Sequence, residues 1–167
     1  MSQTIEQAVK HVVGVADCRV SDRPDEIIVT HALGSCLGVT AYDPAVGAGG
    51  MLHVMMPSAS INPEKAKVNP YMFVDTGVPA FFRKMYEFGC QKKRMVIKVA
   101  GGANIQSRDS DKFAIGKRNF IMLKKLFWKN GILIDNDDVG GVKARTMYLE
   151  IATGNVWLSS SGNVSEL

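Results

Sequence analysis

The first third of the chain alternates between short apolar runs and turn residues. The runs are rich in valine, isoleucine and other residues that favour strands. They predict strands at residues 12–20, 26–30, 36–42 and 51–56. The segment DPAVGAGG at 43–50 joins the last two, and its Asp-Pro opening and its glycines are typical of a turn. This part of the sequence therefore predicts an antiparallel hairpin.

Two later stretches have the periodicity of amphipathic helices. Apolar side chains recur at helical spacing from Val78 to Phe88, and Asp75 or Thr76 can cap this helix. Residues 117–130 predict a second helix, with apolar side chains on one side and lysines on the other. Residues 57–72 contain three prolines, so we expect a loop before the first helix.

The rest of the chain completes a mixed α/β pattern. Further strands are predicted at 94–100, 132–135, 145–151 and 155–159, with an exposed loop at 104–112. Because each helix lies between strands, crossover connections and some parallel pairing are expected. The expected fold class is therefore α/β (α+β): a layered sandwich of a mixed β-sheet with two long helices, forming a single domain over residues 1–167.

Composition places the chain among ordinary globular proteins. Of its 167 residues, 46% are hydrophobic and 22% are charged, which is enough apolar material for a core. The N-terminus lacks the apolar segment of a signal peptide, and no apolar run is long enough to span a bilayer. We therefore expect a cytoplasmic protein that does not insert into a membrane.

The charge of the chain is weakly basic, with a formal net charge of +4. Basic residues gather at 92–94 and again at 117–129. Neither group is interleaved with a stripe of aromatic residues, and no nucleic-acid-binding motif is present, so solvated helix faces are favoured over a nucleic-acid partner. A positive patch that attracts an acidic protein partner remains an alternative.

The three cysteines are Cys18, Cys36 and Cys90. Their odd number and wide spacing argue against a disulfide framework, and no Cys/His cluster has the spacing of a zinc site. We therefore expect free thiols, no bound metal and no cofactor. Free thiols are usually small buried hydrophobic groups, so a chemical role for any one of them needs further support.

Such support comes from the predicted hairpin. If its axis lies between Pro44 and Ala45, Cys36 stands directly opposite His53, with both side chains on one face. An adjacent imidazole can take the proton of a thiol and leave a reactive ion pair. The geometry is sensitive to the turn, since a bulge in DPAVGAGG shifts the register and reorients one of the two side chains.

The residues around Cys36 favour the same chemistry. Gly34 and Ser35 precede it at a tight corner, where backbone N–H groups can hold a developing oxyanion. Thr30 lies at the entrance of this corner and can orient the histidine, as the third member of a triad. A purely structural Cys-His contact is the alternative interpretation, and His31 is a rival base.

The motifs around these residues resemble those of the CheD family of chemoreceptor glutamine deamidases. The similarity extends from about residue 12 to 155. It is carried by TxxLGSC at 30–36, GVTAYDP at 38–44, GGMLHVMMP at 49–57, VAGGAN at 99–104, IGKRN at 115–119 and Gly-Gly at 140–141.

The resemblance implies a fold and a reaction. It implies an α/β sandwich that hydrolyses glutamine side chains to glutamate on methyl-accepting chemotaxis receptors, as a protein-glutamine glutaminase. Some members of the family are also credited with glutamate methylesterase activity. The roles that the family implies are nucleophile for Cys36, base for His53 and orienting group for Thr30. The implied partners are the receptor's cytoplasmic domain and a CheC-type phosphatase.

Two departures and two alternatives accompany this resemblance. His31 stands where a small or apolar residue is expected, and Val139 stands where threonine is frequent before the Gly-Gly pair. The protein is alternatively a regulatory module that stimulates a CheC-type phosphatase with little catalysis of its own. A Cys-His hydrolase of an unrelated small amide or ester is the third possibility.

Overall fold

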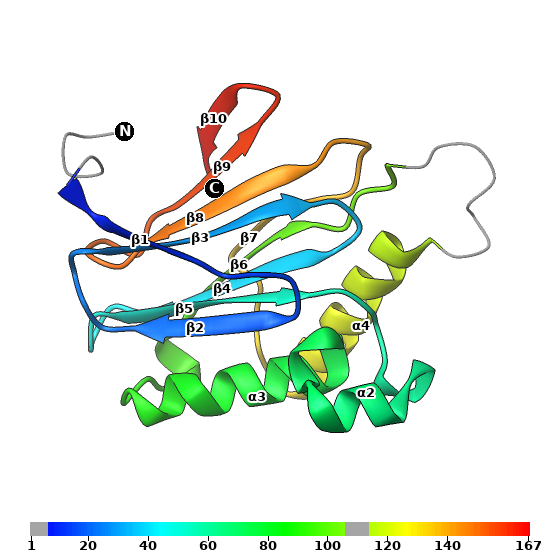
Figure 1. The fold of residues 1–167 in the computed structure, drawn as a ribbon. Coiled ribbons are helices and arrows are strands. Elements are labelled where there is room, and N and C mark those ends of the chain that lie inside the picture. Colours follow the sequence, from blue (N-terminus) through cyan, green and yellow to red (C-terminus); the bar gives the residue numbers. More distant parts are fainter. Residues whose placement is uncertain (1–6, 106–113) are drawn as a thin grey trace.

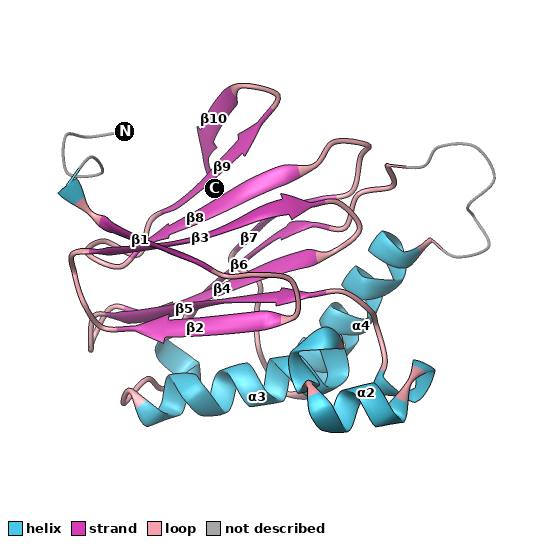
Figure 2. Ribbon diagram, viewed as in Figure 1, coloured by secondary structure: helices cyan, strands magenta, loops and turns pink. Residues whose placement is uncertain are grey.

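The secondary structure is arranged in three layers (Figure 1). A computed structural model describes residues 7–105 and 114–167. Two five-stranded sheets face one another, and the helices cover the outer face of the second sheet (Figures 1 and 2). The predicted α+β fold class and its layered form are thus confirmed, with two mixed sheets in place of one.

The first sheet has the strand order β1-β3-β8-β9-β10. Its strands are β1 (Val9–Val12), β3 (Glu26–Leu33), β8 (Arg145–Glu150), β9 (Val156–Ser160) and β10 (Asn163–Glu166). The second sheet has the order β2-β5-β4-β6-β7. Its strands are β2 (Asp17–Ser21), β5 (Ala48–Val54), β4 (Leu37–Asp43), β6 (Val96–Gly101) and β7 (Asn136–Val139). The helices are α2 (Pro63–Val68), α3 (Val74–Glu87) and α4 (Ile115–Lys129), with short 3₁₀ turns at 59–61, 70–72 and 92–94.

The hairpin of β4 and β5 forms the middle of the molecule. Every residue of both strands is buried, because the first sheet covers one face of the hairpin and the helices cover the other. On the helix side, alternate residues such as Leu37, Val39 and Leu52 pack with α3 and α4 in one core. On the opposite side, Met51 packs with the first sheet in a second core. Each face of the hairpin therefore supports a different layer.

The predicted crossover is present at α4. This helix connects β6 to β7, and these two strands pair in parallel. The pair β1 and β3 is also parallel, whereas the other strand pairs are antiparallel. The two sheets are thus mixed in the sense that the sequence predicts.

The prediction of one strand over residues 12–20 is wrong. The chain leaves the first sheet after β1 and enters the second sheet at β2. The change of direction includes Ala16, whose φ of 57° lies outside the extended region of a regular strand. Valine-rich composition alone does not reveal such a bend, because the apolar residues before and after it are buried in different cores.

Several predicted boundaries are also corrected. Residues 57–72 contain α2, whose first turn is capped by the side chain of Asn62. Helix α3 begins at Val74, so Asp75 is not its cap; its carboxylate accepts the N–H of Ala59 instead. The strand expected at 132–135 begins only at Asn136, and β10 was not expected. The loop expected at 104–112 lies mostly outside the described residues.

Asp43 fixes the turn between β4 and β5. Its buried carboxylate accepts N–H groups of Ala45 and Gln91 and pairs with Arg94 at 2.9 Å. Burial by itself raises the pKa of Asp43, but the hydrogen bonds and the charge of Arg94 hold it below its ordinary value. One carboxylate therefore ties the hairpin turn to the segment that follows α3.

We predict that Asp43→Asn lowers the free energy of unfolding by about 3 kcal/mol, because it removes the buried anion that Arg94 faces. Urea unfolding followed by circular dichroism measures this change. Asp25→Asn is the matched control, since Asp25 forms an exposed pair with Arg23 and its loss costs at most about 0.5 kcal/mol. Equal effects of the two substitutions contradict the role given to Asp43.

Candidate active site

The structure places Cys36 and His53 on the same side of the hairpin but not directly opposite each other. His53 pairs with Gly38, so the predicted register is wrong by two residues. The four-residue turn at 44–47 is centred one residue later than expected. Its last residue, Gly47, has φ of 66° and donates its N–H to the carbonyl of Asp43. A shift of two residues leaves side chains on the same face, and Cys36 packs against the core between the sheets.

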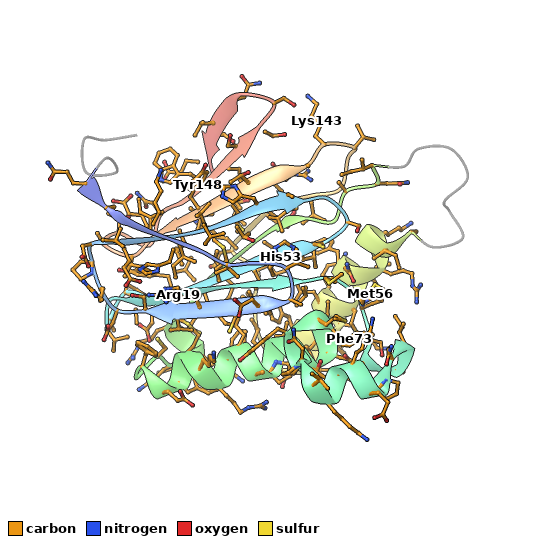
Figure 3. All side chains as sticks on the ribbon, in the orientation of Figure 1. Arg19, His53, Met56, Phe73, Lys143 and Tyr148 are labelled. Carbon is orange, nitrogen blue, oxygen red and sulfur yellow. The ribbon has the colours of Figure 1, made fainter. Side chains whose placement is uncertain are left out.

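The side chain of His53 points between the two sheets (Figure 3). It is 0% exposed, and Thr30 of β3, which is equally buried, lies beside it. Thr30 Oγ1 is 2.7 Å from His53 Nδ1 and 2.8 Å from the carbonyl oxygen of Val13. A buried hydrogen-bonded contact therefore joins strands of different sheets, as the Arg19–Glu26 pair and the bond from Arg145 to the Gly101 carbonyl also do.

These two distances determine which nitrogen of His53 carries the proton. A threonine hydroxyl has a single proton, and Thr30 donates it to the carbonyl of Val13. His53 must then donate its Nδ1–H to Thr30 Oγ1, which leaves the lone pair on Nε2. That atom is buried and has no hydrogen-bond partner. The imidazole is thus oriented with a free basic nitrogen.

Gly38 makes room for this arrangement. It stands opposite His53 in the hairpin. A Cβ atom at this position would lie 2.8 Å from Met147 Sδ and 2.9 Å from Leu33 Cδ1, both of which come from the first sheet. The glycine after Cys36 and Leu37 therefore allows the two sheets to approach closely around the histidine.

The corner that carries Cys36 is held by its carbonyl groups. The carbonyl of Gly34 accepts the N–H of Ala103 and that of Cys36 accepts the N–H of Gly102, each at 2.8 Å. The carbonyl of Ser35 between them accepts a hydrogen bond from Asn119 Nδ2 at 3.0 Å. Three consecutive carbonyls are thus fixed by donors from outside the corner.

Asn119 also connects the corner to the strand of the histidine. The side chain is completely buried on α4. Its Nδ2 donates to Ser35, next to the cysteine, and at 2.9 Å to the carbonyl of Met55, just after β5. Its Oδ1 is buried without a partner. One amide group therefore sets the position of the cysteine corner relative to the end of the histidine strand.

Two glycines allow these elements to meet. Gly101 has φ of 110°, and a Cβ atom there would collide with the carbonyl oxygen of Cys36. Gly116 is the second residue of α4, and a Cβ atom there would lie 2.5 Å from the carbonyl oxygen of Gly102. The motifs VAGGAN and IGKRN are thus explained by close backbone approach on both sides of the corner.

Both motifs were recognised in the sequence, but no role was predicted for Asn119 or Gly102. Their partners are distant in the chain and reach the corner only through the fold, so spacing held no signal for them. His31, the rival base, lies on the other face of β3 from Thr30. It is exposed, and its Nδ1 is 3.5 Å from Thr146 Oγ1.

An open pocket of about 890 Å³ lies against the corner. Cys36 lines it, whereas His53 and Thr30 do not. The other lining residues come mainly from the two Gly-Gly segments and from the first half of α4, and they include Gly34, Ser35, Ile105, Lys117, Phe120 and Lys124. The half-buried cysteine is therefore the member of the group that a large ligand can contact.

Burial keeps both reactive groups neutral. It lowers the pKa of His53 from its ordinary 6.5 to about 4. It also raises the pKa of the Cys36 thiol above its ordinary 9.0, although the backbone N–H of Cys36 opposes this shift. At neutral pH the site therefore holds a thiol and an unprotonated imidazole, not the ion pair that the hairpin suggested.

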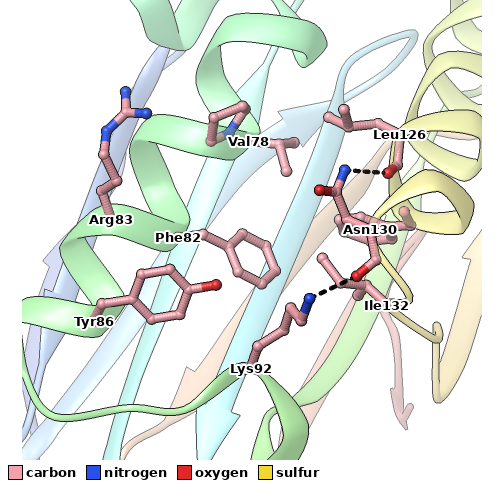
Figure 4. Close-up of a pocket in the computed structure, with 10 residues that line it drawn as sticks. Val78, Phe82, Arg83, Tyr86, Lys92, Leu126, Asn130 and Ile132 are labelled. Carbon is pink, nitrogen blue, oxygen red and sulfur yellow. Dashed lines mark hydrogen bonds between the residues drawn. The ribbon is translucent and has the colours of Figure 1, made fainter.

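A smaller pocket of about 250 Å³ lies between α3 and α4 (Figure 4). Phe82, Leu126 and Ile132 line it, and Lys92 Nζ donates to the carbonyl of Asn130 at its edge. It contains no cysteine, histidine or carboxylate. Its lining offers packing and a few donors but no nucleophile, so the larger pocket is the candidate active site.

Within residues 7–105 and 114–167, no group of three His, Cys, Asp or Glu side chains is arranged to hold a metal ion. In the same part of the chain, no helix has the length and apolar character that crossing a bilayer requires.

Comparisons with known proteins agree with the motifs. The family described as CheD chemotactic sensory transduction matches residues 55–160. A "Probable chemoreceptor glutamine deamidase CheD 1" of Syntrophus aciditrophicus is 50% identical over 151 residues, which are 90% of this chain and 94% of that protein. A "Probable chemoreceptor glutamine deamidase CheD" of Solibacter usitatus is 45% identical, over 93% of this chain and 92% of that protein.

More distant similarities extend the comparison. A relative from Pyrococcus abyssi with the same name is 38% identical, over 86% of this chain and 87% of that protein. A crystal structure of Neisseria meningitidis protein NMB0706 has a TM-score of 0.48 and 10% identity, over 83% of this chain and 65% of that one. That structural likeness is too weak to support an argument. The sequence matches, in contrast, cover nearly the whole chain at high identity, and this protein belongs to the CheD family.

Proposed function

We propose that the protein deamidates glutamine side chains of a chemoreceptor, with Cys36 as the nucleophile and His53 as the general base. The observation that carries the proposal is the state of His53. Its Nδ1–H is held by Thr30, while its Nε2 is buried, basic and without a partner on the face that Cys36 shares. The names of the relatives supply the substrate, since they are called chemoreceptor glutamine deamidases.

The first step forms a thioester. Cys36 Sγ attacks the side-chain carbonyl carbon of the glutamine as its proton passes to His53 Nε2. The negative charge of the tetrahedral intermediate rests on the former carbonyl oxygen. The imidazolium then gives the proton to the nitrogen, the C–N bond breaks, and ammonia leaves.

The second step releases glutamate. A water molecule attacks the thioester carbon while His53 Nε2 takes one of its protons. When the C–S bond breaks, the sulfur regains a proton and the free thiol is restored. Thr30 contributes as a positioning residue throughout, because its contact with Nδ1 keeps Nε2 free to exchange protons.

The backbone N–H groups of Ser35 and Cys36 are the proposed hydrogen-bond donors to the oxyanion. Gly34, the other candidate, donates its own N–H to the carbonyl of Ala32 at 2.9 Å and is left out. In the part of the chain that the structure describes, the N–H of Ser35 has no acceptor. Because the three carbonyls of this corner are fixed, its amides keep their direction during the reaction.

The methylesterase activity, the location in the cell and the regulatory partner are proposed from the resemblance and from the chemistry of the site. The same thioester route hydrolyses a glutamate methyl ester, with methanol in place of ammonia as the leaving group, so methylesterase activity is part of the proposal. The substrate would be the receptor's cytoplasmic domain, which places the protein in the cytoplasm. A CheC-type phosphatase is the proposed regulatory partner.

We predict that Cys36→Ala lowers ammonia release from a chemoreceptor cytoplasmic fragment by at least about 10³-fold, because the thioester cannot form. Mass spectrometry of the fragment reports the same loss at individual glutamines. Cys18→Ala removes a buried thiol of the helix-side core and serves as the control. Deamidation by the Cys36→Ala protein at the wild-type rate excludes the proposed nucleophile. If that variant also keeps full stimulation of a CheC-type phosphatase, the partner role is independent of catalysis.

We predict that the folded state loses stability as the pH falls from 6.5 to 4. In this range the unfolded chain binds a proton on His53 that the folded chain does not bind, and the full difference is worth about 3 kcal/mol. His53→Gln removes the titrating group. Its stability, measured by urea unfolding at a series of pH values, should fall less steeply than that of the wild type. Parallel curves for the two proteins contradict a low pKa for His53.

We predict that Asn119→Asp lowers kcat for deamidation by about tenfold or more and stability by about 3 kcal/mol, because two buried carbonyls lose their donor without a change in side-chain shape. Steady-state kinetics and thermal unfolding measure the two effects. Asn130→Asp, at the exposed end of the same helix, is the matched control. A destabilised Asn119→Asp protein with an unchanged kcat shows that the amide supports only the fold.

A further inference from the structure

The solvent-exposed side of α4 has an unusual composition. Every exposed residue of the helix is basic except two, which are large and apolar. At about 100° per residue these positions fall within an arc of roughly 140°. We call them the α4 face: Lys117, Arg118, Ile121, Lys124, Lys125, Trp128 and Lys129.

The five cations of the α4 face are not balanced within the protein. Among the described residues, none of them forms an ion pair with a carboxylate, and α4 contains no acidic residue. Two of the acids that follow the helix are engaged elsewhere: Asp135 accepts the N–H of Ile97, and Asp138 pairs with Arg145. The positive charge of the α4 face is thus available to another molecule.

The positions of two of these cations also oppose helix stability. Lys117 and Arg118 lie near the N-terminus of α4, where the helix dipole disfavours positive charge, and the first turn carries no acid. Lys125 and Lys129 are a like-charged pair at a spacing of four residues. Lys129 lies in the last turn, where the same dipole favours a cation, so the unfavourable placement is greatest in the first turn. Local preferences that are violated there are expected where a function requires the charges.

The apolar members of the α4 face are suited to protein contact. Trp128 is 84% exposed and Ile121 is 50% exposed. They are seven residues apart and therefore lie on one line along the helix, with cations on both sides. A central tryptophan surrounded by charged residues is typical of the residues that dominate protein–protein binding energy.

The α4 face is continuous with the pocket of Cys36. Lys117, Ile121 and Lys124 belong to the face and also line that pocket. A protein whose glutamine enters the pocket therefore lies next to α4, with part of its surface close to the cations. Acidic groups on that surface gain most from this contact.

We infer that the α4 face docks an acidic surface, with an apolar ridge for Trp128, of the protein whose glutamine reaches Cys36. This inference rests on the proposed function, since it concerns how the same substrate is held. The shared pocket favours a protein over an anionic lipid surface, because a membrane laid on α4 would cover the approach to Cys36. The cations steer the substrate and the tryptophan anchors it, while the chemistry stays with Cys36 and His53.

The experiment compares the full-length wild type with Lys125→Glu/Lys129→Glu and with Trp128→Ala, whose positions do not line the pocket. The substrate is the purified cytoplasmic fragment of a chemoreceptor. We expect kcat/KM to fall by about tenfold through KM, with kcat nearly unchanged. Added NaCl should reduce kcat/KM of the wild type more than that of the double variant. Alkylation of Cys36 by iodoacetamide should proceed equally in all three proteins.

Lys65→Glu/Lys67→Glu on α2 is the matched control, because it changes the net charge equally on an exposed helix that lines neither pocket. An unchanged KM in the α4 variants, or an equal loss in this control, overturns the inference. So does α4-dependent binding to vesicles of phosphatidylcholine and phosphatidylserine without an effect on KM, which would assign the face to a membrane.

If the wild type deamidates no receptor fragment, the proposed function is wrong, and the inference about the α4 face is tested by binding. Calorimetric titration of the fragment with the wild type and the α4 variants then decides the inference alone. Weaker binding by the variants supports it, whereas equal binding, or none by the wild type, overturns it.

Discussion

The corner between β3 and β4 carries three consecutive carbonyl groups, and each accepts a hydrogen bond from a different donor outside the corner. Two donors are backbone amides after β6, and the third is the side chain of Asn119. Because an unpaired buried carbonyl is costly, these bonds leave the corner few alternatives. The cysteine, the Gly-Gly segment and α4 consequently act as one unit, and the pocket keeps its shape only while all three are in place.

A second constraint joins the two sheets. Thr30 of the first sheet contacts His53 of the second beside the apolar core between the sheets. A polar pair in such surroundings is favourable only when its hydrogen bonds are satisfied, and here one atom, Nε2, is left without a partner. The cost of that atom falls on stability, and the corresponding gain is an imidazole of fixed orientation. Orphaned polar atoms of this kind are expected at functional sites more than in ordinary cores.

The sequence was sufficient for the fold class and for most of the helices and strands, and insufficient for the division into two sheets and for the connections between them. Periodicity predicted α3 and α4 because each buries one regular face, and the β4–β5 hairpin followed from two apolar runs joined by turn residues. The sequence pattern predicted one strand in place of β1 and β2, because a bend between two buried segments leaves the apolar pattern intact. The Cys36–His53 pairing was displaced by two residues because the turn at Asp43 encloses four residues. Asn119 had no local signal, since its partners, Ser35 and Met55, become neighbours only through the fold.

Burial of Cys36 also affects how its thiol reacts with oxidants in the cell. Peroxides and other oxidants react with the thiolate form of cysteine, and burial raises the pKa of this thiol so that little thiolate exists between turnovers. Cys18 and Cys90 are shifted in the same direction. The thiol of Cys36, the proposed nucleophile, is therefore expected to form sulfenic acid and mixed disulfides more slowly than a cysteine that rests as a thiolate.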